Sequence, residues 1–333
     1  MKDSKPITKY QDLLRKQHYE IVGNHSAVEI CSWTKKSLRN EGVCYKQKFY
    51  GINCHRCCQM SPTYSCDQKC IFCWRANEFF PGKTFDFEIP VDSPDDIITG
   101  CIKAQIRKLS GFGGNEKTNE EKFKEAQEPM HFALSLTGEP TLYPQLSKLI
   151  AELHKRGKTT FLVTNGQHPD VLKKLAKDNT LPTQLYISLD ATTPAEFKKI
   201  NVPLNKDGWQ RLNKTLKLLP KLDCRKVIRI TVINGHNEKA ISGFAKMLAV
   251  TQPDYVEVKS YMHVGYSRNR LPKEAMPRHS EIRDFSKKLV KKTNEVFRER
   301  FSEKGSWKII DEQVRSRVVL IGPEDRKDRI MKF

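Results

Sequence analysis

Short apolar segments alternate with amphipathic ones through the middle of the chain. The apolar segments are uniformly hydrophobic and lack the polar alternation of a sheet with one face in water. The intervening segments place apolar side chains three and four positions apart, which is the period of a helix packed on one side. We therefore predict strands at 131–137, 159–165, 184–190, 226–233 and 255–261, and helices at 143–156, 168–177, 194–200, 207–219 and 237–250.

This alternation predicts a parallel sheet with helices outside it. A further strand at 62–65 brings the β/α units to six, which is short of the eight that close a TIM barrel. The predicted fold is therefore α/β, a partial open (β/α)6 TIM-like barrel at 61–262. A cysteine-bearing N-terminal extension at 1–60 precedes it, and a basic C-terminal extension at 263–333 completes the same domain.

The flanking segments are less regular. Residues 23–65 hold five cysteines but no sustained period, and residues 111–129 read as a glycine-rich, charged excursion. Amphipathic patterns elsewhere are typical of helices, and Ser93 and Asp95 suit a capped start for the helix at 94–109. We predict helices at 2–22, 94–109 and 279–300, and a last strand at 315–322.

The net charge of the chain indicates which class of molecule it binds. The 59 Lys and Arg against 39 Asp and Glu give a net charge of +20, which attracts polyanions such as nucleic acid or an anionic lipid surface. A protein that is basic merely for solubility is the alternative. The first residues are polar and charged, unlike a secretory signal, and no apolar run approaches the ~18 residues of a membrane span. We expect a cytoplasmic, reducing compartment, with the cysteines acting as ligands.

Three cysteines, Cys66, Cys70 and Cys73, form a C-x3-C-x2-C array with Phe72 immediately before the third. Three thiolates on one loop match three irons of a [4Fe-4S] cluster, because each iron normally takes one cysteine sulfur. The fourth iron is then open to chelate S-adenosylmethionine, and reduction breaks the sulfonium C–S bond to give a 5'-deoxyadenosyl radical. A structural zinc site is the alternative, although zinc normally takes four protein ligands.

Small and polar residues follow the predicted strands at the carboxyl edge, where active groups gather in a parallel α/β sheet. Singly, each of these groups is also typical of an ordinary turn. Behind the cysteine array they form a more specific pattern. The residues are Gly138, Glu139, Pro140, Thr164, Asn165, Ser188 and Asp190.

Together these elements resemble the radical S-adenosylmethionine superfamily, whose motif is C-x3-C-x-aromatic-C after the first strand. The resemblance implies that the three cysteines hold the cluster, with Phe72 at the aromatic position. It also implies that the segment 138–140 binds the methionine amino group, although Thr137 stands where the fuller motif has a glycine. The ribose and carboxylate contacts would come from Thr164, Asn165, Ser188 and Asp190.

A closer resemblance extends over about residues 10–322, to the 4-demethylwyosine synthase family. It is carried by IVGNHSAVEIC (21–31), CYKQKFYGI (44–52), HRCCQMSP (55–62), LTGEPTLYP (136–144) and YMHVGYSRNRL (261–271). The resemblance implies a lyase that condenses N1-methylguanosine, next to the anticodon of phenylalanine tRNA, with pyruvate to form a tricyclic base. It is to the single-domain, archaeal-type form, which implies an external one-electron donor of flavodoxin or ferredoxin type.

The family carries a second [4Fe-4S] cluster, and the resemblance assigns it to Cys31, Cys44 and Cys57. Spacing alone leaves Cys54 and Cys58 open as the third ligand. The alternative is that the extra thiols are buried apolar fillers, since free cysteine is often buried.

Lys46 stands two residues after Cys44. The resemblance points to Lys46 as a catalytic lysine that forms a Schiff base with pyruvate, which requires an amine deprotonated by a desolvated or cationic setting. Lys48 is the second candidate. Charge pairing with the pyruvate carboxylate is a milder role for the same side chain.

Basic residues gather near the C-terminus, where they suit phosphate contacts that read no bases. The aromatics just after the cysteine array suit stacking on an extruded base, with a place in the core as the alternative. The basic residues are Arg268, Arg270, Lys273, Arg278, His279, Lys287, Lys288, Lys291, Lys292, Arg298 and Arg300, and the group after the array is Trp74, Arg75 and Phe79.

Two rival functions follow from the same features. One is a radical enzyme that acts on another substrate, such as a glycyl-radical activase, and the other is a non-catalytic zinc RNA-binding protein. The basic C-terminal residues and the upstream cysteines favour a tRNA-modifying radical enzyme over the first rival, and iron and sulfide analysis of anaerobically purified protein distinguishes it from the second.

Overall fold

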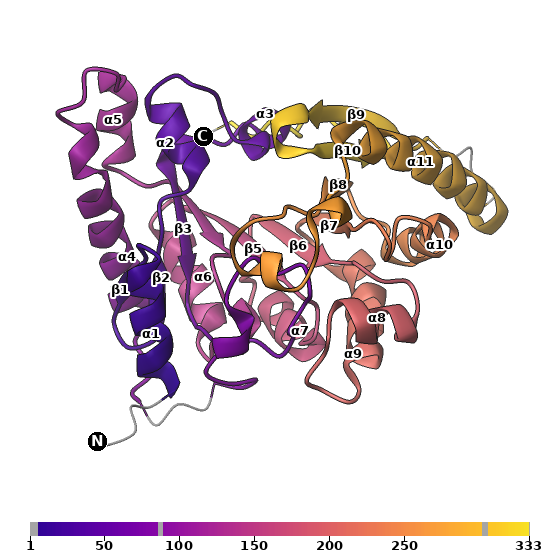
Figure 1. Cartoon of the computed structure of the whole chain (residues 1–333), viewed down its shortest axis with the longest axis horizontal. Helices are drawn as coiled ribbons and strands as arrows, with labels where there is room; N and C mark the ends of the chain where they lie inside the picture. The colour runs from indigo at the N-terminus through magenta and orange to yellow at the C-terminus, as the bar shows by residue number, and fades with distance from the viewer. Residues whose placement is uncertain (1–5, 86–88, 302–305, 333) are drawn as a thin grey trace.

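A single mixed sheet forms the centre of the molecule in the computed structural model, which describes residues 6–85, 89–301 and 306–332 (Figure 1). The strand order is β1-β2-β3-β4-β5-β6-β7-β8-β10-β9. Strands β3 to β8 pair in parallel, whereas the pairs at the two edges are antiparallel. The strands are β1 (Glu20–Val22), β2 (Ser26–Val28), β3 (Cys57–Ser61), β4 (His131–Leu134), β5 (Thr159–Thr164), β6 (Gln184–Ser188), β7 (Arg225–Val232), β8 (Tyr255–Ser260), β9 (Lys308–Gln313) and β10 (Val318–Gly322).

Helices α4, α6, α7, α9, α10 and α11 contribute to one large core against the outer face of the parallel strands. Successive side chains of a strand point to opposite faces, so Leu162 joins this outer core while Phe161 points inward. The α-helices are α1 (Pro6–Lys16), α2 (Ser32–Leu38), α3 (Tyr45–Tyr50), α4 (Pro94–Leu109), α5 (Glu120–Ala126), α6 (Leu146–Lys155), α7 (Pro169–Lys177), α8 (Pro194–Ile200), α9 (Gly208–Leu218), α10 (Ile241–Thr251) and α11 (His279–Phe301). The predicted α/β fold with six parallel strands is confirmed.

Helix α3 fills the inner face of the sheet. Its Tyr45, Phe49 and Tyr50 are buried in a second core with Phe161 of β5 and Tyr186 of β6. These two strand residues lie before the carboxyl ends of their strands. These apolar side chains therefore fill the interior of the sheet before the strands end. The predicted site residues lie further along, at the carboxyl edge.

The N-terminal extension departs from its prediction. The helix expected at 2–22 ends at Lys16, because His18 takes a left-handed backbone with φ 65° and Glu20–Val22 forms an edge strand; residues 2–5 lie outside the described residues. The first parallel strand is Cys57–Ser61, not 62–65. Strands β1 and β2 have three residues each, too few to show a period in the sequence.

The C-terminal part also differs from its prediction. The last strand begins at Val318 rather than at residue 315, because Val314–Ser316 is a 3-10 turn and Arg317 has φ 47°. Its partner β9 was not predicted, since its sequence KIIDEQ is largely polar. The excursion at 111–129 contains the short helix α5. In the ranges that the structure describes, every helix is too short or too polar to cross a bilayer.

Candidate active site

The loop that carries Cys66, Cys70 and Cys73 follows the carboxyl end of β3 and is fastened to the end of α8. The Ile71 N–H donates to the Ile200 carbonyl at 3.0 Å, and the Cys73 N–H donates to the Cys70 carbonyl at 3.1 Å. All three cysteines are half-buried. One fixed loop therefore presents three sheltered thiols.

The thiols of this loop lie in a desolvated setting beside acidic side chains. Burial raises the pKa of Cys66, and the neighbouring Asp67 and Cys70 raise it further. The pKa of Cys70 is likewise raised by burial, then by Cys73 and Asp190. Such thiols become thiolates when a metal binds them, because coordination deprotonates a thiol outright. The donor set fits an iron–sulfur cluster.

Polar atoms beside this loop are buried without a partner. They are Gln68 Nε2, Asn201 Oδ1 and Asp190 Oδ2. Buried polar atoms normally find a partner, so these positions fit a polar ligand or water. Within the described ranges no three His, Cys, Asp or Glu side chains converge to share a single metal ion, whereas in a [4Fe-4S] cluster each thiolate binds its own iron.

Asp67, inside the cysteine array, connects the loop to the neighbouring strand ends. Its fully buried carboxylate accepts hydrogen bonds from Asn165 Nδ2 at 2.7 Å and Asn205 Nδ2 at 2.9 Å, and it pairs with His168 Nε2 at 3.0 Å. Burial lowers the pKa of His168, but the hydrogen bond and charge of Asp67 outweigh it and leave the pKa raised. The sequence offered no sign of this role except the position of Asp67 between two of the cysteines.

Glu139 joins the loops after β4 and β5. Its buried carboxylate accepts from the Thr141 N–H at 3.1 Å and from the Asn165 N–H at 2.8 Å. Gly138 has φ 71°, and a Cβ there would lie 2.4 Å from the Thr63 carbonyl oxygen. Glycine therefore allows this turn to approach the chain just before the cysteine loop.

The remaining predicted residues lie at the same carboxyl edge. Pro140 is buried at the start of a 3-10 turn, and Thr164 Oγ1 accepts from the Gly166 N–H at 3.1 Å. Asp190 accepts from the Thr231 N–H at 2.8 Å, and burial raises its pKa to about 6. Ser188 is half-buried at the end of β6, and Phe72 packs against the apolar cluster of Ile200, Ile233 and Tyr261.

A second group of thiols lies at the other end of the interior. Cys31 and Cys44 are the N-cap residues of α2 and α3, and Cys57 begins β3. Burial raises the pKa of Cys44, and the neighbouring Cys31 raises it further. The pKa of Cys57 is also raised by burial, with Lys46 lowering it and Cys31 raising it. The structure thus brings these three cysteines together beside Lys46.

Of the other two upstream cysteines, Cys54 lies beside this group and Cys58 does not. Cys58 points to the opposite face of β3, into the outer core, where its thiol neighbour is Cys101. Cys54 is buried, and its sulfur lies 3.5 Å from the Cys44 amide nitrogen and 3.8 Å from the Trp33 carbonyl oxygen. Strand alternation thus separates Cys58 from the group that contains Cys57.

Lys46 is enclosed by aromatic rings of the inner face. Its Nζ lies 4.9 Å from the Tyr186 ring centroid and 5.5 Å from that of Phe161. Burial lowers the pKa of Lys46, and the Arg229 guanidinium lowers it further, while Glu257 acts in the opposite direction. Burial and the Arg229 charge therefore both favour the neutral form of the Lys46 amine.

Three charged residues of the inner face were missed in the sequence. Arg229 on β7 pairs with Glu257 on β8 at 2.9 Å. Burial lowers the pKa of Lys259, two residues further along β8, to about 8, and its Nζ donates to the Ser316 carbonyl at 3.3 Å. The sequence signal that could have identified these residues is a charged side chain within an otherwise apolar strand.

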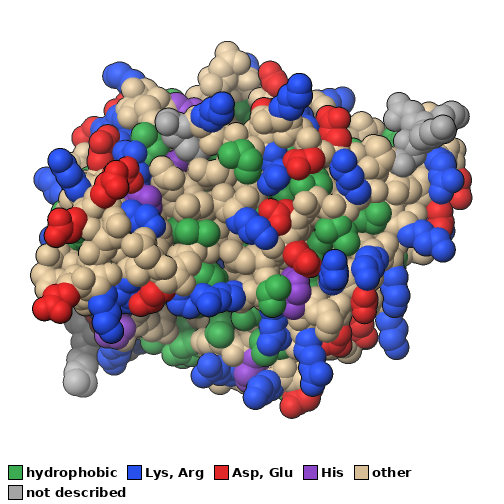
Figure 2. Space-filling model, turned by 90° about the horizontal axis from the view of Figure 1, so that it is seen from above, with side chains coloured by type: hydrophobic (Ala, Val, Ile, Leu, Met, Phe, Trp, Pro, Cys, Tyr) green, Lys and Arg blue, Asp and Glu red, His purple; other side chains and the backbone are tan. Residues whose placement is uncertain are grey.

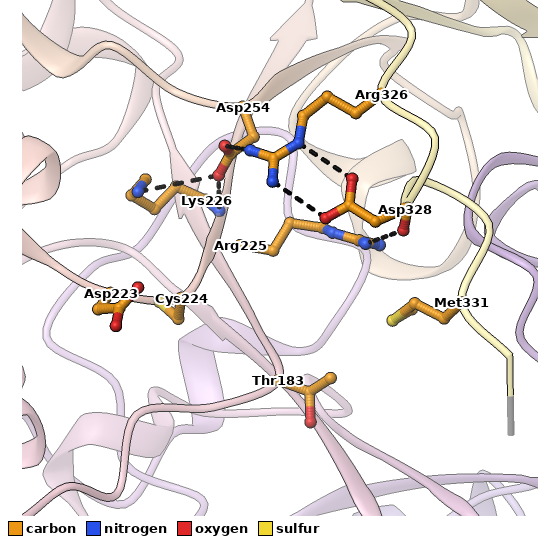
Figure 3. Close-up of a pocket in the computed structure, with 9 residues that line it drawn as sticks. All are labelled: Thr183, Asp223, Cys224, Arg225, Lys226, Asp254, Arg326, Asp328 and Met331. Atoms are coloured by element: carbon orange, nitrogen blue, oxygen red, sulfur yellow. Dashed lines mark hydrogen bonds and ion pairs between the residues drawn. The ribbon is translucent and has the colours of Figure 1, made fainter.

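A cavity of about 320 Å³ is lined by residues at the amino ends of β6, β7 and β8 (Figure 3). The cysteine loop follows the carboxyl end of the parallel strand β3, so it lies at the opposite edge of the sheet. Its charged groups compensate one another, since Arg326 pairs with Asp254 at 2.8 Å and with Asp328 at 3.0 Å. The C-terminal segment that lines it also reaches α3, where Arg329 donates to the Phe49 carbonyl at 2.7 Å. The ion pairs around the cavity fasten the C-terminal segment to the sheet. None of the predicted site residues lines the cavity.

Several of the basic residues near the C-terminus are bonded within the protein and do not form one continuous exposed surface. Arg270 donates to the Ile71 carbonyl, His279 pairs with Glu312 at 3.0 Å, and Lys292 pairs with Glu295 at 2.8 Å. On the face seen in Figure 2, Lys and Arg side chains are interspersed with Asp and Glu. Lys288 and Lys291 of α11 remain exposed.

Two family models match the chain. The Radical SAM superfamily model matches residues 60–248, and the model for wyosine base formation matches residues 250–322. The boundary between the two models falls just before β8. Together the matches take in the cysteine loop, all six parallel strands except the start of β3, and the last helix and strands.

Similar proteins cover nearly the whole chain. The S-adenosyl-L-methionine-dependent tRNA 4-demethylwyosine synthase of Pyrococcus abyssi is 47% identical over 94% of this chain and 88% of its own length. The protein of the same description from Methanocaldococcus jannaschii is 41% identical over 95% of this chain and 96% of its own.

Solved structures that are similar to this chain belong to the same kind of protein as these relatives. A structure of TYW1 with a lysine-pyruvate adduct bound has a TM-score of 0.83 and 38% identity, covering 97% of this chain and 98% of that one. A crystal structure of archaeal TYW1 has a TM-score of 0.74 and 35% identity over 97% of this chain and 99% of that one. The chain accordingly belongs to the family of S-adenosyl-L-methionine-dependent tRNA 4-demethylwyosine synthases, enzymes of the radical SAM superfamily.

Proposed function

We propose that this tRNA-modifying enzyme condenses N1-methylguanosine, next to the anticodon of phenylalanine tRNA, with pyruvate, which it holds as an imine on Lys46. The observation that carries the proposal is the setting of Lys46, an amine between two aromatic rings and beside the Cys44 and Cys57 thiols. The lysine-pyruvate adduct in a solved relative supports it.

The interior supplies what imine formation needs. The neutral Lys46 amine attacks the keto carbon of pyruvate, and loss of water leaves the C=N bond. Arg229 and burial lower the pKa of Lys46, so a larger share of the amine is neutral at a given pH. Arg229 and Lys259 are cations on the same inner face that can hold the pyruvate carboxylate.

We assign the cofactors to the two cysteine groups. Cys66, Cys70 and Cys73 would hold the [4Fe-4S] cluster of the radical chemistry, and Cys31, Cys44 and Cys57 would hold a second one. The first cluster with S-adenosylmethionine supplies a hydrogen-abstracting radical when reduced. The binding of S-adenosylmethionine would fall to Phe72, Gly138, Glu139, Pro140, Thr164, Asn165, Ser188 and Asp190.

The remaining parts of the proposal concern the context of the reaction. An external one-electron donor of flavodoxin or ferredoxin type would reduce the cluster, and the enzyme would work in the cytoplasm. We also propose the division of the chain into an N-terminal extension at 1–60, a core at 61–262 and a C-terminal extension at 263–333.

Anaerobic incubation tests the function directly. The reconstituted protein, N1-methylguanosine-containing tRNA, S-adenosylmethionine, pyruvate and a chemical reductant should give the tricyclic nucleoside by mass analysis of the digested tRNA. Borohydride reduction with labelled pyruvate should leave label on the peptide that contains Lys46. Lys48→Ala is the matched control, and it should still give the labelled peptide. Product without any trapped label would contradict the imine but not the condensation.

A further inference from the structure

Large hydrophobic side chains are exposed next to the cysteine loop. Among the described residues, six such side chains are exposed, and three of them, Trp74, Phe79 and Val264, belong to two segments that meet here. Trp74 is 37% exposed and Phe79 56% exposed. Exposed apolar groups that gather on one surface mark an interaction site more often than scattered ones do.

Direct contacts join the two segments. The Tyr266 N–H donates to the Trp74 carbonyl at 3.0 Å, and the rings of Tyr266 and Phe79 meet edge to face with centroids 6.3 Å apart. The Arg75 guanidinium lies 4.2 Å from the Trp74 ring centroid. We call Trp74, Arg75, Phe79, Val264 and Tyr266 the aromatic platform.

The platform is held from behind. Gly265 has φ 57°, and a Cβ there would lie 2.3 Å from the Trp74 carbonyl oxygen, so the two backbones are in close contact. Arg270 donates to the Ile71 carbonyl at 3.3 Å and the Arg75 carbonyl at 3.2 Å, and it pairs with Glu78 at 2.6 Å. The exposed rings therefore stand on a fixed backbone, which reduces the ordering cost of binding.

The same two segments carry unpaired cations. Lys69, Arg268 and Lys273 are exposed, and in the described parts of the chain no carboxylate forms an ion pair with any of them. Exposed aromatic rings, the Arg75 guanidinium over the Trp74 ring and exposed cations nearby in the sequence combine the two features that bind single-stranded nucleic acid, stacking and charge. A protein partner would need complementary apolar groups but not these cations.

We propose that bases of the tRNA anticodon loop beside the target guanosine stack on the aromatic platform. The proposal rests on the proposed function, in which the guanosine must reach the cysteine loop. An enzyme that acts on a base takes it out of its stack, which leaves neighbouring bases without a stacking partner. Exposed aromatic side chains next to the reaction site replace that partner, as in the recognition of RNA loops.

Binding measurements with tRNA that contains N1-methylguanosine test the platform. Trp74→Ala and Phe79→Ala should each raise Kd by about five-fold to a hundred-fold, the range for losing an aromatic that stacks on a base. The dependence of Kd on salt should stay the same, because no charge is removed. Trp74→Phe should retain most of the affinity, and Val314→Ala, an exposed apolar residue outside the platform, should bind like wild type.

A fluorescent base gives a second, direct readout. With 2-aminopurine next to the target position, wild type should change its emission on binding by stacking, and Trp74→Ala with Phe79→Ala should abolish that change. Iron content and the thermal midpoint check that each variant is folded. If Trp74→Ala does not fold, Phe79→Ala and Trp74→Phe decide the question.

The outcomes separate the platform from the proposed function. If wild type converts the tRNA but the alanine variants bind it with wild-type affinity, the platform is wrong and the function stands. If the variants bind tRNA normally and lose only activity that depends on a protein electron donor, the surface docks that donor and the proposal is overturned. If wild type neither binds nor converts the tRNA, both fail.

Discussion

The Arg270 guanidinium donates a hydrogen bond to the backbone carbonyl of Cys73, across 197 positions of the sequence. The same side chain also reaches the carbonyls of Ile71 and Arg75. Sequence alone placed Arg270 among the phosphate-binding residues, whereas here it holds the loop with the third cysteine. The segment after β8 and the cysteine loop are therefore one structural unit.

Arg270→Ala should impair retention of the cluster without removing a ligand. Hydrogen bonds to a charged donor contribute about 1.5–3 kcal/mol each, and the alanine variant lacks several at once. We expect less iron and sulfide per chain after anaerobic reconstitution and slower cleavage of S-adenosylmethionine. Arg270→Lys should rescue little, because an ammonium lacks the planar fork of guanidinium. Arg268→Ala is the control from the same segment, and equal losses in both variants would contradict a specific role for Arg270.

Two cysteine triples should hold separable clusters. Replacing Cys66, Cys70 and Cys73 by alanine should leave about half of the iron and abolish cleavage of S-adenosylmethionine, since each iron takes one cysteine sulfur. Replacing Cys31, Cys44 and Cys57 should also halve the iron but leave the other cluster. Cys58→Ala is the control, because its side chain lies on the opposite face of β3. A first triple variant that still cleaves S-adenosylmethionine would disprove the assignment.

Variants of Lys46 should separate the cleavage of S-adenosylmethionine from the formation of the tricyclic base. Lys46→Ala should keep reductive cleavage of S-adenosylmethionine and lose the tricyclic product, because the amine serves pyruvate alone. Lys46→Arg keeps the charge but is effectively never deprotonated, so it cannot form an imine. Comparison of product and 5'-deoxyadenosine in single turnovers measures the division. Near-normal product from Lys46→Arg would leave charge pairing as the role of this side chain, and full activity of Lys46→Ala would turn attention to Lys48.

Salt dependence should report which lysines bind phosphate. Lys287 and Lys292 are partly compensated by Asp284 and Glu295, so the exposed Lys288 and Lys291 should contribute more. A lysine that neutralises one phosphate releases the counterions condensed there. Changing such a lysine to glutamine should therefore reduce the slope of log Kd against log salt by about 0.7 to 0.9.

The control for this measurement is Lys214→Gln, an exposed lysine on α9. It should leave the slope unchanged, as should the removal of an aromatic ring from the platform. An unaltered slope in Lys288→Gln with Lys291→Gln would place the tRNA away from α11.

His131 should make the fold sensitive to acid. It is fully buried, its Nε2 accepts from the Asn53 N–H at 3.1 Å, and burial, followed by the charge of Arg56, lowers its pKa to about 3. The unfolded chain binds a proton near pH 6.5, so the contribution to stability is complete above that pH and is lost as the pH falls toward 3. The loss is at most about 1.4 kcal/mol per pH unit.

Urea unfolding from pH 7 to 4 measures this effect. His131→Asn should flatten the pH dependence of the unfolding free energy relative to wild type, because it removes the group that gains a proton on unfolding. His236→Asn, an exposed histidine, is the control. Parallel curves for wild type and His131→Asn would mean that the ring is protonated in the folded protein.

Local patterns predicted much of this molecule. Uniform apolar runs identified five parallel strands to within three residues at each end, because strands buried on both faces need no long-range information to look apolar. The C-x3-C-x2-C spacing and the strand-end residues are also short-range signals, and the structure gathers them at one edge of the sheet. Polar or very short edge strands such as β1 and β9 left no comparable trace.

Tertiary structure decided what depends on partners far away in the chain. Whether a cysteine at 57 or 58 faces the other thiols depends on which side of β3 the helices cover, and a shift of one residue reverses it. Asp67, Arg229 and Arg270 look like ordinary polar residues in the sequence, since charged side chains are usually solvated. They acquire their roles from bonds to Asn165, Glu257 and Cys73, which only the folded chain brings within reach.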